Sequence, residues 1–325
     1  MMVKRWLPWV IKGGLSFGLI AWVLSGIDFA DAWARAQALD PLMLAASVAL
    51  MVVQTALGAL RWGMVVRALS ARLDPLKTLG VYYIGVFFSI VLPGAVGGDA
   101  VRMWFARRSG LELHAAINSV MLERASTVYG LVLLVCLTQP ILLTRVPDLP
   151  GVWVFPVLMA VATLGILVLA TLDRLPVALH RWKVVRWLVH LATDTRRLFF
   201  HPGWSLGTLA VALVGHVNLS LAVYVLAVGL GIDLHVLDCL VLVPPVILVI
   251  TLPISIAGWG VRESAMVTAF AFVGVSGTSS VVLSVLFGLV TMVAALPGGL
   301  VFLAMRHPIA EMEGDTAKVE QTAGS

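Results

Sequence analysis

The chain has 325 residues, of which 60% are hydrophobic and 12% are charged, and its mean hydropathy is +1.01. Roughly a quarter of the residues of a water-soluble domain are charged, so this composition excludes a soluble globular protein and predicts an all-α polytopic membrane protein. The net charge of +5 is modest. Lys and Arg gather beside apolar segments, which is typical of membrane topology signals rather than of a nucleic-acid-binding face.

Six apolar runs are long enough to cross about 30 Å of hydrocarbon as helices that rise about 1.5 Å per residue. The first is residues 7–27, which we expect to be retained as a span because Lys12 interrupts it and no small-residue cleavage site follows Ser25. The other five are residues 41–60, 115–137, 152–172, 206–230 and 279–305.

Two further apolar runs, residues 81–101 and 240–272, have Pro and Gly at their centres. A continuous helix is not expected through either centre, because proline removes a backbone donor and both residues interrupt helices. We predict that each run enters the membrane and returns to the same side as a re-entrant hairpin. The alternative is that both runs cross the bilayer, which gives eight spans.

The distribution of basic residues predicts the orientation. By the positive-inside rule, loops rich in Lys and Arg lie in the cytoplasm. We therefore expect a multi-pass protein of the bacterial inner membrane with both termini in the cytoplasm. The basic residues follow the second span (Arg61, Arg67, Arg72 and Lys77) and the fourth span (Arg174, Arg181, Lys183, Arg186, Arg196 and Arg197).

Two segments at the membrane boundary carry their own predictions. Residues 175–200 alternate basic with apolar side chains, which favours an interfacial amphipathic helix; a plain basic loop is the alternative. Residues 306–325 are polar, and we expect a disordered cytoplasmic tail there. A single transmembrane domain, residues 1–305, accounts for the rest.

The two broken runs resemble each other. Residues 92–102 and 252–262 align without a gap and share Leu, Pro, Gly, Val and Arg at five positions, with an offset of 160 (253 − 93). The chain then divides into halves, about 1–140 and 150–305, with an odd number of spans in each, so the halves have opposite orientations. Paired broken segments in an inverted repeat point to a binding site at the membrane midplane.

Irregular backbone inside the bilayer implies a polar cavity, because unbonded N–H and C=O groups are costly in hydrocarbon. We expect Asp99 to cap a helix that restarts at Ala100, with Arg102 in its first turn. In the second copy, Arg262 and Glu263 follow the break directly. A helix N-terminus beside an arginine suits a phosphate group. The glycines of the proposed substrate-binding site are Gly97, Gly98 and Gly258.

Both arginines also have structural alternatives. Arg102 could extend with Arg107 and Arg108 to the cytoplasmic surface. Arg262 could form a structural pair with Glu263 or Glu123.

Two charged residues, Glu123 and Arg124, lie inside the span 115–137, where an unpaired charge costs roughly 2.5–3.5 kcal/mol. We expect both to face inward and to meet charges of the broken segments. Glu123 would pair with Arg102 or Arg262, and Arg124 with Asp99 or Glu263. A structural network and a substrate-linked one both remain open at this point. Asn118, His216 and Asn218 are more typical of contacts between helices than of ligands.

Three ordered motifs carry a family resemblance: Pro-Gly-Ala-Val-Gly-Gly-Asp-Ala-Val-Arg at 93–102, Glu-Arg at 123–124, and Pro-Ile-Ser-Ile-Ala-Gly-Trp-Gly-Val-Arg-Glu at 253–263. The sequence resembles the transmembrane region of lysylphosphatidylglycerol synthase and the stand-alone, flippase-like proteins that share it. The resemblance implies a polytopic inner-membrane fold and, for the synthase relatives, flipping of aminoacylated phosphatidylglycerol. The second motif departs from the Gly-Gly-x-Gly that is frequent in the family, and the soluble synthase domain is absent, so lysyl transfer is not implied.

We therefore expect a lipid flippase or transporter of an anionic or phosphate-linked lipid, such as a phospholipid or a polyprenyl-phosphate-linked lipid, and not an enzyme. No catalytic, metal or cofactor motif is recognised. The alternatives are a membrane-embedded transferase and an accessory subunit of a synthase or glycosyltransferase in glycolipid, aminoacyl-phospholipid or cell-envelope synthesis. No nucleic-acid partner is expected.

Overall fold

The computed structural model describes residues 29–92, 97–146, 151–174, 183–251 and 260–323, with side chains described up to Met305. These residues form eleven α-helices and one short 3-10 helix. In chain order the helices are α2 (Phe29–Gln37), α3 (Pro41–Ala68), α4 (Pro75–Val91), α5 (Gly97–Arg108), α6 (Leu113–Arg145), α7 (Val154–Ala170), η1 (Leu172–Arg174), α8 (Lys183–Phe199), α9 (Pro202–Gly229), α10 (Val236–Thr251), α11 (Val261–Ala271) and α12 (Gly277–Ala323).

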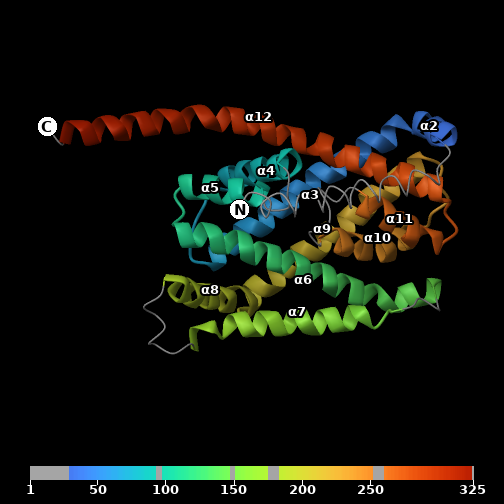
Figure 1. Ribbon diagram of the computed structural model, residues 1–325, viewed down its shortest axis with the longest axis horizontal. Helices are drawn as coiled ribbons and strands as arrows, with labels where there is room; N and C mark the ends of the chain where they lie inside the picture. Colours follow the sequence, from blue (N-terminus) through green and yellow to red (C-terminus); the bar gives the residue numbers. More distant parts are fainter. Residues whose placement is uncertain (1–28, 93–96, 147–150, 175–182, 252–259, 324–325) are drawn as a thin grey trace, which may run out of the picture.

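Four of the described helices are long and apolar enough to cross a membrane: α3, α6, α9 and the part of α12 from Gly277 to Met305. Three shorter helices, α4, α7 and α10, are also apolar. The long helices run roughly along one axis of the molecule (Figure 1). The all-α, multi-pass membrane fold predicted from composition is confirmed. The first predicted span, residues 7–27, lies outside the described residues.

The helices stop at both Pro/Gly motifs, as predicted. α4 ends at Val91 and α5 begins at Gly97, whereas α10 ends at Thr251 and α11 begins at Val261. The breaks themselves, 93–96 and 252–259, lie outside the described part of the chain. Each pair of helices is in contact, and the α4–α5 pair and the α10–α11 pair lie toward opposite ends of the long axis (Figure 1).

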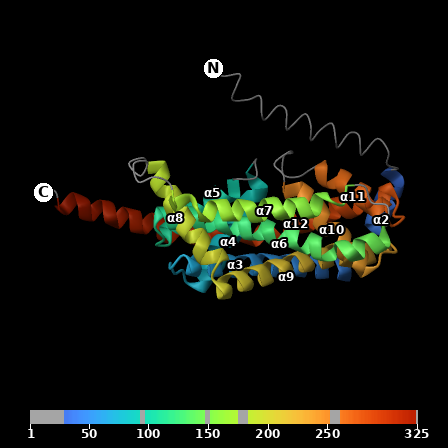
Figure 2. The ribbon, with the colours of Figure 1, turned by 90° about the horizontal axis from the view of Figure 1, so that it is seen from below.

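Among the described helices, α3 and α9 make the most extensive contact. They lie side by side along one face of the bundle (Figure 2). Ser47 Oγ donates to the carbonyl of Ala222 at 3.0 Å, and Asn218 Nδ2 donates to the carbonyl of Leu50 at 2.9 Å. Residue numbers rise along α3 as they fall along α9, so the two helices are antiparallel.

The two helices approach each other closely at both ends because α9 has a glycine there. A Cβ atom on Gly229 would lie 2.7 Å from Cβ of Met43, and one on Gly207 would collide with the Met64 side chain. Each glycine therefore accepts a methionine of α3, and the two helices interlock along their length.

The helix boundaries recur along the chain. α3 and α9 each have 28 residues and are offset by 161 at both ends (202 − 41 and 229 − 68). α10 follows α4 at offsets of 161 and 160 (236 − 75 and 251 − 91). α11 follows α5 at 164 and 163 (261 − 97 and 271 − 108), and α12 begins 164 residues after α6 (277 − 113).

Two boundary segments are helical. Residues 183–199 form α8, and Leu191 and Leu198 are buried against Leu122 of α6 and Val65 of α3. Two interpretations of residues 175–200 were possible, an amphipathic helix or a plain basic loop. The helix is confirmed over 183–199, and the plain loop is wrong there. The second is the end of the chain, where α12 continues as one helix to Ala323; the disordered cytoplasmic tail expected over 306–325 stays a prediction.

Candidate functional site

A buried cluster of charges joins α3, α5 and α6. The carboxylate of Glu123 on α6 lies between two guanidinium groups: Arg61 of α3 donates to Oε1 from Nη2 at 2.5 Å and from Nε at 3.1 Å, and Arg102 of α5 donates to Oε2 at 2.9 Å. The three side chains are 2–5% exposed. Each oxygen of the carboxylate is therefore neutralised by its own arginine.

Aromatic rings and close helix packing hold Arg102 in place. Its guanidinium carbon lies 5.3 Å from the ring centroid of Trp62 and 5.0 Å from that of Tyr82, a favourable position for a cation. A Cβ on Gly98 would collide with the carbonyl of Gly85 and with Ser89. Gly98 therefore lets α5 approach α4 closely enough to bring Arg102 over Tyr82.

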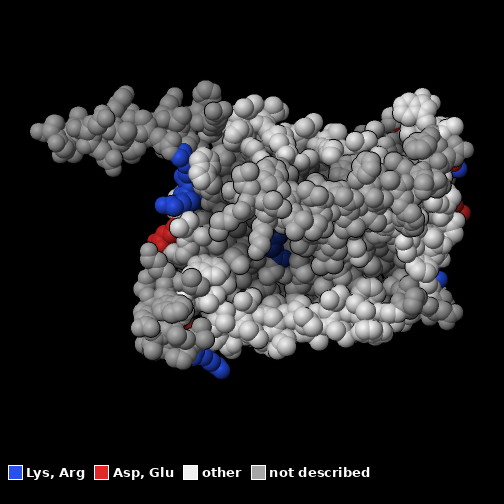
Figure 3. Space-filling view, viewed as in Figure 1, with Lys and Arg blue, Asp and Glu red and all other residues white. Residues whose placement is uncertain are grey.

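A second ion pair extends the cluster outward. Arg124 Nε and Nη2 donate to the two carboxylate oxygens of Asp99 at 2.9 and 3.1 Å, a bidentate geometry. The Arg124 side chain is 54% exposed and that of Asp99 is 14% exposed. Arg102 Nη2 lies 3.4 Å from Asp99 Oδ1, which connects the two pairs. Figure 3 shows basic atoms in a hollow near the middle of this face of the molecule.

The cluster is therefore a row of alternating charges: Arg61, Glu123, Arg102, Asp99 and Arg124. Three guanidinium groups face two carboxylates, which leaves a net charge of +1 in the middle of the helices. Because Arg124 is the exposed end of the row, it is the residue of the cluster most accessible to an anion.

A second cluster lies at the start of α11. Gly260, with φ of 83°, is the N-cap, and its N–H donates to Glu263 Oε2 at 2.6 Å. Arg262 Nη2 donates to Glu263 Oε1 at 2.7 Å, and its Nε lies 3.2 Å from Ser284 Oγ of α12. Gly288 of α12 faces the Arg262 guanidinium so closely that a Cβ there would collide with it.

The structural alternative for Arg262, a pair with Glu263, is thus observed. Both residues occupy the first turn after the break, as predicted. Gly258 lies outside the described residues, and Gly97 opens α5, where a Cβ would lie 2.7 Å from Cβ of Leu92.

The predicted pairs are found in part. Of the partners considered from the sequence, Glu123 meets Arg102, and Arg124 meets Asp99. Within the described ranges, no ion pair joins this cluster to Arg262 or Glu263, which belong to α11. The two arginines of the repeated motif therefore lie in separate clusters rather than in one contact set.

Two sequence-based expectations for α5 are wrong. Asp99 does not cap the helix, because α5 begins two residues earlier, at Gly97, and the Asp99 carboxylate accepts from Arg124 instead. Arg102 does not extend to the surface with Arg107 and Arg108, because pairing with Glu123 holds it at 4% exposure.

Arg61 is not among the predicted site residues, because its position after the second predicted span is typical of a topology signal. α3 continues to Ala68, so Arg61 lies inside the helix and is buried. A signal was present: the residues after Arg61 are Trp62, Gly63, Met64, Val65 and Val66, with no loop residue before Ser70.

The uncharged polar candidates connect helices. Asn118 Nδ2 donates to Asp194 Oδ2 of α8 at 2.7 Å, His216 Nε2 lies 3.1 Å from the Thr127 carbonyl, and Asn218 joins α9 to α3. This confirms their predicted role as contacts between helices. Across the described ranges, no group of three or more His, Cys, Asp or Glu could hold a metal ion.

A comparison with known protein families identifies the family of the chain. The sequence profile described as the lysylphosphatidylglycerol synthase transmembrane region matches residues 9–299. No curated protein matches the chain.

Proposed function

The chain belongs to the family of lysylphosphatidylglycerol synthase transmembrane regions, and from this premise we propose that it moves an anionic or phosphate-linked lipid between the two leaflets of the membrane. The family is associated with aminoacyl-phospholipid synthesis and flipping. The family model covers residues 9–299, and the proposal gives these residues no catalytic step.

The observation that carries the proposal is the net positive charge of the cluster together with the exposure of Arg124. Charged side chains within a membrane span nearly always face the interior of the bundle or a water-filled cavity, even where they are paired with one another. In the described part of the chain, Nε of Arg102 is also buried without a hydrogen-bond partner, which costs roughly 1–3 kcal/mol unless water satisfies it. Both features support a wet cavity that accepts a lipid headgroup.

In this proposal, the headgroup phosphate binds Arg124 in place of the Asp99 carboxylate. A guanidinium group offers two parallel donors to phosphate as it does to a carboxylate. Arg102, 3.4 Å from Asp99, then compensates the released carboxylate. Arg61 and Glu123 position Arg102, and Arg262 with Glu263 stabilises the start of α11.

The architecture proposed for transport is an inverted repeat of two halves, with six full spans and two re-entrant hairpins. Support comes from the recurring helix boundaries, from the antiparallel contact of α3 with α9, and from the placement of the α4–α5 and α10–α11 pairs toward opposite ends (Figure 1). Discontinuous helices in such repeats commonly form midplane binding sites. The basic end of the bundle is assigned to the cytoplasm of the inner membrane, with both termini there.

The link of the family to a synthase favours a second role beside transport. A stand-alone region of this kind could serve a separate synthase or glycosyltransferase that supplies its lipid, and the chain would then be an accessory subunit. Co-purification of such an enzyme with the chain, and loss of its product when the chain is removed, would support this role.

Transport is tested with the purified chain in vesicles that contain a fluorescent phosphatidylglycerol, whose accessibility to an external quencher reports translocation. We expect Arg124→Gln to slow translocation roughly tenfold or more, because a charge-assisted hydrogen bond contributes about 1.5–3 kcal/mol. Arg35→Gln is the matched control, because Arg35 forms an exposed pair with Asp31 on α2 and should leave the rate unchanged.

The variant Arg124→Lys separates binding from folding. It keeps an ion pair with Asp99 between α5 and α6 but lacks the two parallel donors that a guanidinium group offers to phosphate. We expect it to keep thermal stability closer to wild type than Arg124→Gln does and to leave transport slow. Wild-type translocation by Arg124→Gln would reject the proposal.

A further inference from the structure

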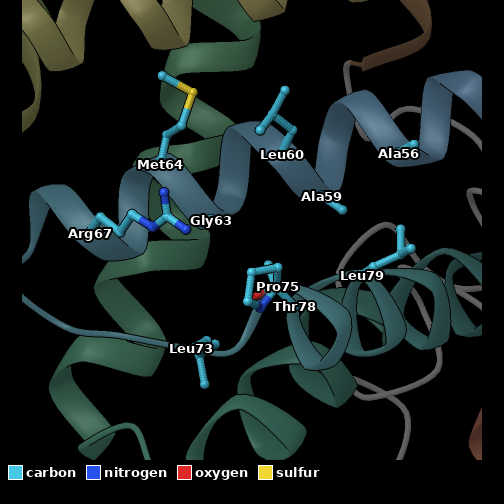
Figure 4. A pocket seen from close by; sticks show the side chains of 10 residues that line it. All are labelled: Ala56, Ala59, Leu60, Gly63, Met64, Arg67, Leu73, Pro75, Thr78 and Leu79. Carbon is cyan, nitrogen blue, oxygen red and sulfur yellow. The ribbon is translucent and has the colours of Figure 1, made fainter.

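A groove lies between α3 and α4, away from the charge cluster (Figure 4). Small residues of α3, namely Ala56, Ala59 and Gly63, form one wall, and Pro75, Thr78 and Leu79 form the other. It has a volume of about 230 Å³ and is predominantly apolar. Ala56 is exposed, so the groove is open at the surface of the bundle.

The groove ends in a basic cavity. Arg67 and Leu73 line both, so the two adjoin, and the cavity adds Arg72, Ser70 and Trp204 in a volume of about 640 Å³. In Figure 4 the Arg67 side chain extends toward Gly63. An apolar slot therefore lies next to a space with two arginines, a hydroxyl group and an indole ring.

The turn after α3 brings the two arginines together. Ser70 has a left-handed backbone, with φ of 61°, and the N–H groups of Ser70 and Ala71 donate to the carbonyls of Arg67 and Val66 at 2.9 and 3.1 Å. This pattern is a helix C-cap that reverses the chain within a few residues. Arg72 therefore returns beside Arg67 instead of continuing away from it.

The positive charge of this cavity is not compensated within the described residues. Neither Arg67 nor Arg72 lies within salt-bridge distance of a carboxylate there. The nearby Asp74 is engaged elsewhere, because its carboxylate accepts from the N–H groups of Leu76 and Lys77 at the start of α4. The cavity is therefore complementary to an anion.

The length of the groove matches one leaflet. From Ala56 to Arg67 the helix advances 11 residues (67 − 56), or about 16 Å at about 1.5 Å per residue. The hydrocarbon core of a bilayer is about 30 Å thick, so half of it is about 15 Å. A lipid tail in the groove would reach the middle of the bilayer with its headgroup at Arg67. Trp204, at the start of α9, lines the cavity, and tryptophan is enriched where membrane proteins meet the headgroup layer.

From these features we propose that the groove and cavity bind one anionic phospholipid of the leaflet at the basic end, with an acyl chain between α3 and α4 and the phosphate between Arg67 and Arg72. The groove lies on the face of α3 that carries Ala59 and Gly63. Arg61 of the charge cluster, two residues from each of them, points to the opposite face of this helix. Binding at this site does not depend on the proposed transport.

The test is native mass spectrometry of the purified full chain titrated with phosphatidylglycerol or with phosphatidylcholine of the same acyl chains. We expect one phosphatidylglycerol to remain bound more tightly than phosphatidylcholine. Arg67→Gln/Arg72→Gln should weaken phosphatidylglycerol binding roughly tenfold or more and remove the preference, because each arginine near the surface contributes about 1 kcal/mol to binding an anionic lipid. Arg174→Gln, which changes an exposed arginine of η1, should change neither.

A second pair of variants tests the tail. Ala56→Phe should fill the groove and weaken both lipids, whereas Val53→Phe, on the same helix but outside the groove and 47% exposed, should not. Equal affinity of the wild type for both lipids, or unchanged binding by the double arginine variant, would overturn the proposal. So would equal competition by glycerol phosphate, which has no tail. Because the readout is lipid retention, its failure is distinct from a failure of transport.

Discussion

At the scale of single residues, Glu123 is held between two buried arginines. It is 2% exposed and accepts from Arg61 and Arg102, so it neutralises two buried cations at once. Removing one member of a buried ion network leaves the others uncompensated, which costs more than the network itself contributes.

We expect Glu123→Gln to lower the free energy of unfolding by roughly 3–5 kcal/mol, because two guanidinium groups would remain buried against a neutral amide. Thermal unfolding in detergent measures this. Glu112→Gln is the control, since Glu112 is on the same side of α6 but 81% exposed, and should change stability by less than about 0.5 kcal/mol. Equal melting temperatures for the two variants would contradict the network.

The same residues show what a sequence can and cannot predict. The position of Glu123 and Arg124 in an apolar span predicts that both need charged partners. The sequence also gives the candidate partners, which are the charges of the broken segments. Which partner is chosen does not follow, because it depends on how α5 packs against α6. Arg61 was missed because an apolar run shows where a helix is hydrophobic, whereas α3 extends eight residues beyond the predicted end at residue 60 (68 − 60).

At the scale of elements, the contact of α8 with α6 contains a carboxylate that is poorly solvated. Asp194 accepts from Asn118 at 2.7 Å and lies 3.9 Å from Arg197, with the stacked rings of His114 and His190 nearby. Burial raises the pKa of the Asp194 carboxyl above its ordinary value of 3.8, against the smaller lowering by the Asn118 hydrogen bond. Its protonated form is therefore favoured by folding.

The sign of the pH dependence follows. Stability from a carboxyl with a raised pKa is present below the unfolded value and is lost as pH rises through the folded value. We expect Asp194→Asn to raise the melting temperature relative to wild type by an amount that grows as pH increases above 3.8. The measurement is a series of melting curves from acidic to neutral pH.

Asp173 provides a control of opposite sign. The hydrogen bond from Arg196 at 2.7 Å lowers the pKa of the Asp173 carboxyl, so the stability that it contributes is lost as pH falls. Asp173→Asn should therefore lower the melting temperature slightly near neutral pH and not at acidic pH. A pH-independent difference between Asp194→Asn and wild type would contradict the assignment for Asp194.

At the scale of the whole molecule, α3 and α9 form an interlocked pair along one face of the bundle (Figure 2). Sliding one helix by a turn, about 5.4 Å, would move Met43 and Met64 away from the glycines that accept them. Two similar Pro/Gly motifs in the sequence predict a repeat, and its inverted orientation stays a prediction. The interlocking of α3 and α9 could not be predicted, because it depends on side-chain contacts between residues far apart in the sequence.

We expect α3 and α9 to move as one unit during transport. With Cys136 and Cys239 replaced by alanine, a cross-link between cysteines at Ser47 and Ala222, which are joined by a 3.0 Å hydrogen bond, should leave lipid translocation unchanged. The reduced protein is the control in the same vesicles. Arrest of transport on oxidation, reversed by a reductant, would show instead that the two helices separate.

The pair of Asp99 and Arg124 also affects how strongly transport should depend on the transmembrane voltage. A single charge moved across 100 mV changes energy by about 2.3 kcal/mol, but the bidentate pair is neutral as a unit. In the proposed exchange, a singly charged phosphate replaces Asp99 on Arg124, and Asp99 turns to Arg102. The new pair of phosphate and Arg124 is again neutral as a unit. The electric field then acts mainly on the lipid's remaining charges, so lipids that differ in headgroup charge should differ in the voltage dependence of their movement.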